Sequence, residues 1–224
     1  MRDYTEFSTL GTEYLQPKQK RIGLLGGTFN PVHNGHIEMA YIALYEFLLG
    51  EVIFLPVGKP PHKSDEFVTT ADHRLKMLRL ATENENRFSV SRIEVDREGT
   101  TYTIDTLEML SRKDKNASFY FIIGSDTLFE LKTWRSLERV MLLTDFICVM
   151  RPGQDEFSVR SYAQTLNAQY GNKIYLANER GSNVSSSQIR ALAAKNKLCK
   201  GLVPESVANY ITQHRIYVQR GADA

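Results

Sequence analysis

The sequence of 224 residues contains few cysteines, and this scarcity limits the classes of protein to which it can belong. It has two cysteines, Cys148 and Cys199, which are too few for the disulfide framework of a small secreted domain. Cys148 lies inside an apolar run, as is typical of a buried thiol. We therefore expect a protein of the reduced cytoplasm.

The sequence also lacks long apolar runs and a strong excess of one charge. No run reaches the roughly 18 residues of a membrane span, and the N-terminus has no apolar signal-peptide core. The 28 Lys and Arg residues nearly balance the 26 Asp and Glu residues, giving a net charge of +2. A nucleic-acid surface would need a clustered basic face. We therefore expect neither a membrane nor a nucleic acid as a partner.

The most informative stretch covers residues 22–36, which read IGLLGGTFNPVHNGH. Its first residues predict a short buried strand. Gly26 and Gly27 follow, and glycines can take a positive φ or let a ligand approach the backbone closely. A helix is then expected from about Gly35, with Ile37, Tyr41, Leu44 and Leu48 on its buried face. A strand, a glycine loop and a helix N-terminus in this order favour a bound phosphate.

Strand and helix patterns alternate along most of the remaining chain. This alternation predicts an α/β fold with a doubly wound, mainly parallel sheet. We expect residues 1–20 to be an N-terminal extension, either a flexible tail or a small amphipathic piece. Residues 21–224 would form a single domain, with a small C-terminal helical subdomain from about 185 to 224. The further expected strands cover residues 52–55, 88–95, 119–123, 146–150 and 174–176, and the further helices start near 70, 103, 159, 186 and 204.

Two further segments have the chemistry of an anion site. The loop of residues 56–63 leaves the carboxyl end of an expected strand, where ligands of open α/β sheets bind, and it contains Lys59, His62 and Lys63. The serine run of residues 185–187 offers helix caps and hydroxyl donors, and Arg190 is expected in the first turn of that helix. Each segment could also be an ordinary solvated loop or a capping run.

Several motifs together resemble a known family. Residues 27–36 resemble the GxFxPxHxGH element of the HxGH nucleotidyltransferases. The chain from about Ile22 to Tyr217 further resembles the bacterial nicotinate-mononucleotide adenylyltransferases. The motifs that carry this second resemblance are Pro60–Lys63, Tyr102–Thr103, Ile122–Asp126, Trp134, Arg151–Gly153 and Ser185–Arg190.

The resemblance implies a Rossmann-like fold and a reaction of NAD biosynthesis. ATP and nicotinate mononucleotide would give nicotinate adenine dinucleotide and pyrophosphate, with Mg²⁺ accompanying ATP. Phosphates and water can hold this ion, so we expect no protein ligand to it. The acceptor phosphate is already deprotonated at neutral pH, so the site needs alignment and charge stabilisation rather than a general base.

The resemblance also assigns roles to individual residues. The implied catalytic residues are His36, on the α-phosphate, with His33, Thr28 and Lys63. The implied ATP-binding residues are Gly26, Gly27, His33, His36, Ser186 and Arg190. For the acceptor, Thr103 would contact the nicotinate carboxylate, Trp134 would stack on the pyridine ring, Asp126 would lie near ribose hydroxyls, and His62 and Lys63 would hold phosphate.

Simpler interpretations of some of these residues remain open. Trp134 could be an ordinary core residue, Asp126 could cap a helix, and Arg190 could be a surface charge. Arg135 stands where many relatives have an aromatic residue. A cation there could favour the carboxylate of the substrate or could simply face water.

Other functions are consistent with parts of the sequence. A dehydrogenase would need a GxGxxG loop and an acidic residue after the second strand, and both are absent. A fragment of a tRNA synthetase would need a KMSKS-like lysine loop, which is also absent. A non-catalytic nucleotide sensor, or an adenylyltransferase acting on nicotinamide mononucleotide or phosphopantetheine, remains an alternative. The sequence does not decide whether the protein forms a homo-oligomer.

Overall fold

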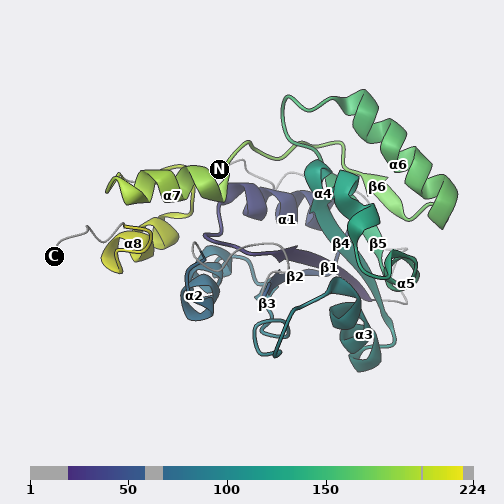
Figure 1. Cartoon of the computed structure of the whole chain (residues 1–224), viewed down its shortest axis with the longest axis horizontal. Helices are drawn as coiled ribbons and strands as arrows, with labels where there is room; N and C mark the ends of the chain where they lie inside the picture. The colour runs from purple at the N-terminus through teal and green to yellow at the C-terminus, as the bar shows by residue number, and fades with distance from the viewer. Residues whose placement is uncertain (1–19, 59–67, 198, 219–224) are drawn as a thin grey trace, which may run out of the picture.

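Parallel strands form the centre of the computed structural model, which describes residues 20–58, 68–197 and 199–218. The sheet has six strands in the order β3-β2-β1-β4-β5-β6, and every neighbouring pair is parallel (Figure 1). This arrangement confirms the predicted doubly wound α/β fold. The strands are β1 Lys20–Gly27, β2 Glu51–Pro56, β3 Phe88–Val90, β4 Ala117–Gly124, β5 Asp145–Val149 and β6 Ile174–Leu176.

The helices cover both faces of the sheet. They are α1 Asn34–Glu46, α2 Ala71–Thr82, α3 Thr103–Lys113, α4 Ser125–Glu130, α5 Leu137–Leu143, α6 Glu156–Tyr170, α7 Ser186–Ala194 and α8 Glu205–Gln213, with a short 3₁₀ turn η3 at Leu131–Thr133. The sequence did not predict α4 and α5, which are too short to show a helical period. Figure 1 shows α1 and α3 on opposite sides of the sheet.

Alternate residues of the central strands enter two separate cores. In β4, Phe119, Phe121 and Ile123 pack with α3, α4, α5 and α6, whereas Ile122 packs with α1 and α2 on the other face. This alternation follows from the two-residue period of a strand. It explains why the central strands read as continuous apolar runs, since both of their faces are buried. Cys148 of β5 is fully buried, as expected.

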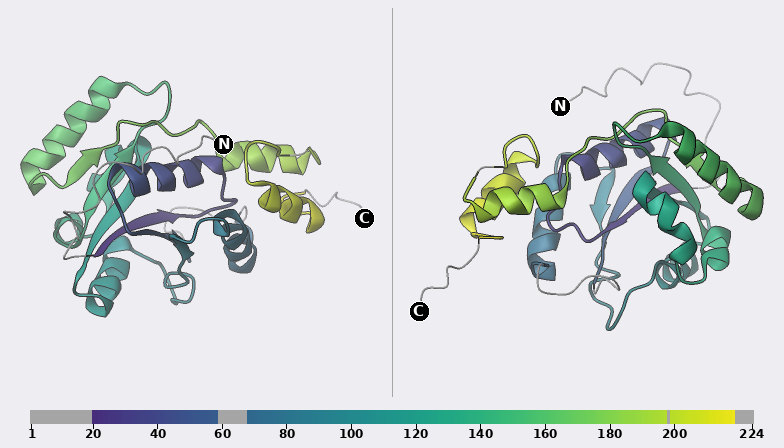
Figure 2. Two further views of the ribbon diagram at one scale, coloured as in Figure 1. Left: turned by 180° about the vertical axis from the view of Figure 1, so that it is seen from behind. Right: turned by 45° about the horizontal axis from the view of Figure 1, so that its top comes forward.

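Helices α7 and α8 lie at one end of the molecule, and α6 lies at the opposite end (Figures 1 and 2). Helix α8 packs against α2: the Ser206 hydroxyl donates to the Leu80 carbonyl at 3.1 Å, and His73 Nδ1 lies 2.9 Å from the Tyr210 hydroxyl. Buried residues of α7 and α8 belong to the same core as those of α1 and α2. The C-terminal helices therefore enlarge the core on the face of the sheet that α1 and α2 cover.

Some local expectations were wrong. The strand expected over 88–95 ends at Val90, because Ser91 starts a turn in which its hydroxyl accepts from the Ile93 N–H at 3.2 Å. Leu48, expected on the buried face of α1, lies beyond the helix with a φ of 51° and is 74% exposed. Arg190 is in the second turn of α7 rather than the first. Apolar spacing alone does not show where an element ends.

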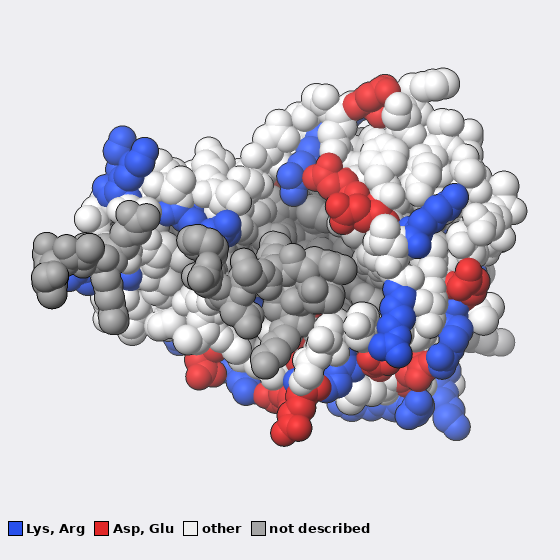
Figure 3. Space-filling model, viewed as in Figure 1, with Lys and Arg blue, Asp and Glu red and all other residues white. Residues whose placement is uncertain are grey.

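The described part of the surface has mixed charge. Figure 3 shows Lys and Arg side chains interspersed with Asp and Glu on the face of Figure 1. Among the described residues, no helix has both the length and the apolar character needed to cross a membrane.

Candidate active site

The carboxyl ends of β1 and β4 lie side by side where the strand order reverses, which is where open α/β sheets bind ligands. Strand β1 ends at Gly27, and Thr28 follows it. Strand β4 ends at Gly124, and Asp126 follows in the first turn of α4. The fold therefore brings the predicted residues Gly26, Gly27, Thr28 and Asp126 to one edge of the sheet.

Close packing, rather than a positive φ, favours glycine at the end of β1. A Cβ atom on Gly26 would lie 2.9 Å from the ring of Phe121, and one on Gly27 would lie 3.2 Å from the ring of Phe29. The left-handed residue of this loop is Phe29, with a φ of 49°. Gly26 and Gly27 do not use the positive φ that glycine allows, and the aromatic rings occupy the space that a side chain would need.

His33 and His36 stack on each other at the N-terminus of α1. Their ring centroids are 3.7 Å apart, with 25° between the ring planes. His33 is the N-cap and is only 4% exposed. Its backbone N–H donates to His36 Nδ1 at 3.2 Å. Because that nitrogen accepts, the proton of the neutral His36 ring is on Nε2.

Both imidazoles are neutral at pH 7. Burial lowers the pKa of His33 to about 4, with a further contribution from the charge of Arg151. Burial lowers the pKa of His36 well below its usual value, and His33 and Arg151 add to the effect. Two neutral rings can donate hydrogen bonds to phosphate oxygens without carrying a proton that the reaction would have to remove.

Two side chains of helix α7 contact the loop that precedes the histidines. The Ser186 hydroxyl donates to the Pro31 carbonyl at 2.9 Å, and Arg190 Nη1 donates to the Asn30 carbonyl at 2.8 Å. Ser185 is the N-cap, and its hydroxyl accepts from the Gln188 N–H at 3.2 Å. The serine run therefore does cap the helix, and Ser186 and Arg190 also reach the loop that carries the histidines.

Asp126 belongs to a polar cluster that includes Arg151. Gln154 Nε2 donates to Asp126 Oδ1 at 3.0 Å, and Arg151 Nη1 lies 3.6 Å from Oδ2. The N-cap of α4 is Gly124, so Asp126 does not cap this helix. The sequence marked Arg151 only as part of a motif. The structure shows a cation whose field reaches both histidines.

The residues expected at the pyridine ring lie on the face covered by α3 and α5. Trp134 is partly buried and packs edge-to-face on Phe121 and Phe146, with centroid distances of 5.5 and 5.9 Å. The Arg135 guanidinium lies 4.6 Å from the ring centroid of Tyr102, next to Thr103, the first residue of α3. Arg135 therefore stacks on an aromatic ring in this structure and connects the Trp134 segment to the start of α3.

Sequence reasoning missed Arg74, which is only 2% exposed. Its guanidinium donates to the carbonyls of Thr28, Val57 and Gly58 at 2.9, 2.8 and 3.5 Å. It therefore joins the loops that follow β1 and β2. The sequence does show an arginine beside the apolar positions of this helix. An arginine buried there needs several hydrogen-bond acceptors, and this need could have pointed to nearby loops.

Two predicted phosphate ligands, His62 and Lys63, lie outside the described residues. Within the ranges that the structure describes, no group of three or more His, Cys, Asp or Glu side chains could hold a metal ion.

The chain resembles known proteins over most of its length. Residues 24–192 match the family model described as cytidylyltransferase-like. The probable nicotinate-nucleotide adenylyltransferases of Thermoanaerobacter sp. and Moorella thermoacetica are each 39% identical over 201 residues, which is 89% of this chain and 95% and 93% of the relatives.

Solved structures show the same fold. The Plasmodium falciparum nicotinic acid mononucleotide adenylyltransferase complexed with NaAD superposes with a TM-score of 0.72 at 23% identity, covering 88% of this chain and 97% of that one. The same Plasmodium falciparum protein complexed with APC gives a TM-score of 0.70 at 21% identity, with the same coverage.

Proposed function

The chain belongs to the nicotinate-nucleotide adenylyltransferase family, and we propose that it transfers the adenylyl group of ATP to nicotinate mononucleotide. The products are nicotinate adenine dinucleotide and pyrophosphate, in a step of NAD biosynthesis. The observation that carries the proposal is the pair of stacked, neutral histidines at the N-terminus of α1, facing the loop that Ser186 and Arg190 also reach.

The proposed chemistry is in-line attack of the acceptor phosphate on the α-phosphorus of ATP. An oxygen of nicotinate mononucleotide forms the new bond, and pyrophosphate leaves with the electrons of the broken bond. The nucleophile is already an anion at neutral pH, so no general base is needed. The protein must align two anions and stabilise the charge that develops between them.

His36 is the proposed donor to the reacting phosphate. Its Nδ1 is occupied by the His33 N–H, so Nε2–H is the group that can donate. His33 lies against it and would contact the phosphates of ATP. Gly26, Gly27 and Thr28 would lie along the nucleotides at the end of β1, with Thr28 reaching the reacting phosphate.

The departing pyrophosphate would be held from α7. Ser186 and Arg190 already contact the loop of residues 30 and 31, and Arg190 supplies a fixed positive charge. His62 and Lys63 are proposed as further phosphate ligands from the loop after β2. These groups act by position and charge, as in other phosphoryl-transfer sites.

The acceptor would bind beside α3. We propose that Trp134 stacks on the pyridine ring, that Thr103 contacts its carboxylate, and that Asp126 lies near the ribose hydroxyls. The first N–H groups of α3 have no side-chain cap. Free N–H groups at a helix N-terminus favour a carboxylate over a neutral carboxamide.

A divalent metal, proposed to be Mg²⁺, would enter with ATP. We propose that phosphate oxygens and water coordinate the ion. When bound, it would neutralise part of the triphosphate charge. We place the reaction in the cytoplasm, as the cysteine content suggests.

Pyrophosphate release, measured with ATP and Mg²⁺, tests the proposal. Nicotinate mononucleotide, nicotinamide mononucleotide and phosphopantetheine are offered separately. Fast release with nicotinate mononucleotide alone is expected. Equal rates with both pyridine nucleotides would contradict the preference for the acid. Release with phosphopantetheine alone would show that phosphopantetheine, rather than nicotinate mononucleotide, is the acceptor. No release with any of them, by a protein that still binds ATP, would favour a nucleotide sensor.

A further inference from the structure

Two of the buried polar atoms without a hydrogen-bond partner among the described residues lie next to Gly35. They are His33 Nδ1 and the Ser182 hydroxyl oxygen. The His36 N–H faces the His33 side chain in the capping box, but it donates to the His33 carbonyl at 2.9 Å. An unpaired buried polar group costs about 1–3 kcal/mol, so such atoms are rare in folded proteins and need an explanation. Ser182 lies in the connection between β6 and α7.

The two atoms converge on Gly35. A Cβ atom placed on Gly35 would lie 3.1 Å from His33 Nδ1 and 3.3 Å from the Ser182 oxygen. Both atoms therefore border the small space left by the missing side chain. The glycine between the two histidines keeps this space open, and a methyl group there would separate the serine from the ring.

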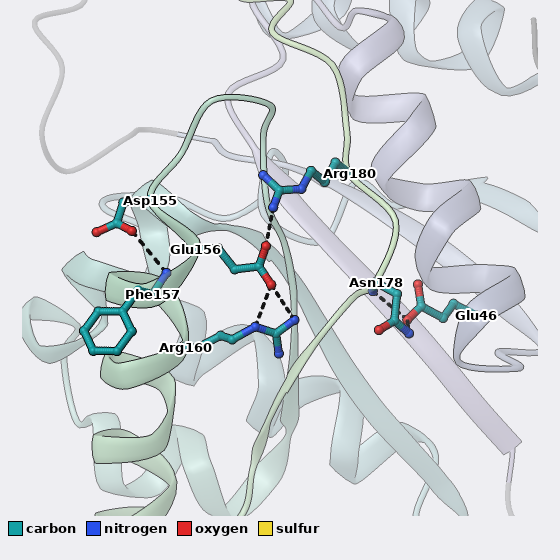
Figure 4. Close-up of polar contacts among 7 residues, drawn as sticks. All are labelled: Glu46, Asp155, Glu156, Phe157, Arg160, Asn178 and Arg180. Atoms are coloured by element: carbon teal, nitrogen blue, oxygen red, sulfur yellow. Dashed lines mark hydrogen bonds and ion pairs between the residues drawn. The ribbon is translucent and has the colours of Figure 1, made fainter.

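Two backbone hydrogen bonds hold the segment at Ser182. Its N–H donates to Glu38 Oε2 of α1 at 2.9 Å, and the preceding Gly181 N–H donates to the Met150 carbonyl at 3.0 Å. Farther back along the same connection, Arg180 pairs with Glu156, and Asn178 donates to Glu46 at the end of α1 (Figure 4). Only the side-chain torsion of Ser182 and the rotation of its hydroxyl remain adjustable.

We propose that Ser182 is a positioning residue whose hydroxyl donates a hydrogen bond to His33 Nδ1 and so places the ring proton on Nε2. The bond requires a rotation about the Ser182 side-chain torsion across the space beside Gly35. It satisfies both buried atoms at once. It also fixes the plane of the His33 ring, which lies against His36.

The direction of this hydrogen bond rests on the proposed function. A neutral imidazole has one donor and one acceptor nitrogen, and the partner of one nitrogen decides the state of the other. If Nδ1 accepts, Nε2 carries the proton and can donate to a triphosphate oxygen. If Nδ1 instead donated to Ser182, Nε2 would present a lone pair to an anion. His36 already has its proton on Nε2, because the His33 N–H occupies its Nδ1.

The ring-nitrogen resonances of His33, recorded by ¹⁵N NMR on the full chain at pH 7, test the tautomer without any activity measurement. In the unmodified protein we expect an unprotonated Nδ1 and a protonated Nε2. A protonated Nδ1 would overturn the proposal. The tautomer is measured without substrate. The proposal for Ser182 can therefore fail while the proposed function stands, and the proposed function can fail while the tautomer is as expected.

The variant Ser182→Ala removes the hydroxyl, and Ser182→Thr retains it. We expect Ser182→Ala to mix the two tautomers of His33, raise KM for ATP and lower kcat by about tenfold, a loss typical for a group that orients a histidine. KM for nicotinate mononucleotide should not change. Ser182→Thr should restore the tautomer. The matched control is Ser161→Ala, at an exposed position of α6, for which no change in tautomer or rate is expected.

An unchanged His33 tautomer in Ser182→Ala would overturn the proposal, even if activity fell, because the loss would then be structural. If Ser182→Ala does not fold, a protonated Nδ1 in the unmodified protein would still overturn the proposal.

Discussion

At the scale of single residues, the site depends on histidines that stay neutral. Burial and the nearby Arg151 oppose a second proton on either ring, and the hydrogen bond from the His33 N–H fixes the tautomer of His36. A neutral donor can stabilise developing phosphate charge and needs no proton transfer. The two histidines are therefore proposed as hydrogen-bond donors rather than as acid and base.

Replacing His36 by alanine should remove one well-aimed donor to the reacting phosphate. We expect kcat for pyrophosphate release to fall by about 10²–10³, equivalent to roughly 3–4 kcal/mol. The control is His214→Ala, an exposed histidine just after α8, which should keep the parent rate. A His36→Ala protein that turns over within threefold of the parent would disprove the catalytic role.

The depressed pKa of His33 predicts how stability depends on pH. Above pH 6.5 the ring is neutral in both the folded and the unfolded chain, so its contribution is complete. Between pH 6.5 and about 4, the unfolded chain binds a proton that the folded protein does not, so the free energy of unfolding decreases as pH falls. The loss should approach roughly 3 kcal/mol.

Denaturant unfolding at pH 7, 6, 5 and 4 measures this dependence. The variant His33→Asn lacks the titrating ring, so its curve should be flatter by about the amount that His33 contributes. Carboxyl groups titrate in both proteins, and the difference between the two curves removes their effect. Parallel curves would show that the folded protein does not hold His33 neutral.

At the scale of elements, α2 ties together two loops that follow neighbouring strands. Arg74 reaches the carbonyls of Thr28, Val57 and Gly58 from a buried position on this helix. Thr28 directly precedes the loop of the histidines, and Gly58 begins the loop that is expected to carry His62 and Lys63. The helix therefore contacts the starts of both segments that are proposed to bind phosphate.

The variant Arg74→Ala would leave these carbonyls without their donor. We expect the free energy of unfolding to fall by about 3 kcal/mol and KM for ATP to rise. Thermal unfolding and pyrophosphate release measure the two effects. The matched control is Arg79→Ala, an exposed arginine on the same helix, which should change neither quantity appreciably. Equal behaviour of the two variants would refute this role of α2.

At the scale of the whole molecule, the segment that follows α8 reaches back to the active-site loop. The Tyr217 hydroxyl donates to Asn30 Oδ1 at 2.8 Å across 187 residues of sequence, and the Thr69 N–H donates to the same oxygen at 3.1 Å. Helices α7 and α8 belong to the core of α1 and α2. The C-terminal helices therefore help to build the site rather than only cover it.

The variant Tyr217→Phe removes only the hydroxyl, and it should weaken the contact between the segment after α8 and the active-site loop. We expect a loss of about 1 kcal/mol in the free energy of unfolding and a higher KM for ATP, with kcat close to the parent value. The control Tyr175→Phe removes a partly exposed hydroxyl that bonds Asp145, at the opposite end of the sheet. An unchanged KM in Tyr217→Phe would mean that the segment after α8 does not affect ATP binding.

The sequence by itself determined the layers of the fold and the location of the chemistry. Continuous apolar runs predicted the central strands, because strands buried on both faces have no polar side. The stretch of residues 22–36 predicted a strand, a loop and a helix with His33 and His36 at its start, because these signals are local. The serine run was likewise placed at a helix N-terminus, where Ser185 is the cap.

Only the tertiary structure decided how distant residues meet. Arg74 and Tyr217 contact the active-site loops, the charge of Arg151 reaches both histidines, and Ser182 is proposed to orient His33. No local sequence pattern records such long-range relations. The tautomer of His36 and the low pKa of His33 depend on burial and on neighbours that folding supplies. The sequence specifies which groups are present, and packing specifies their protonation and their partners.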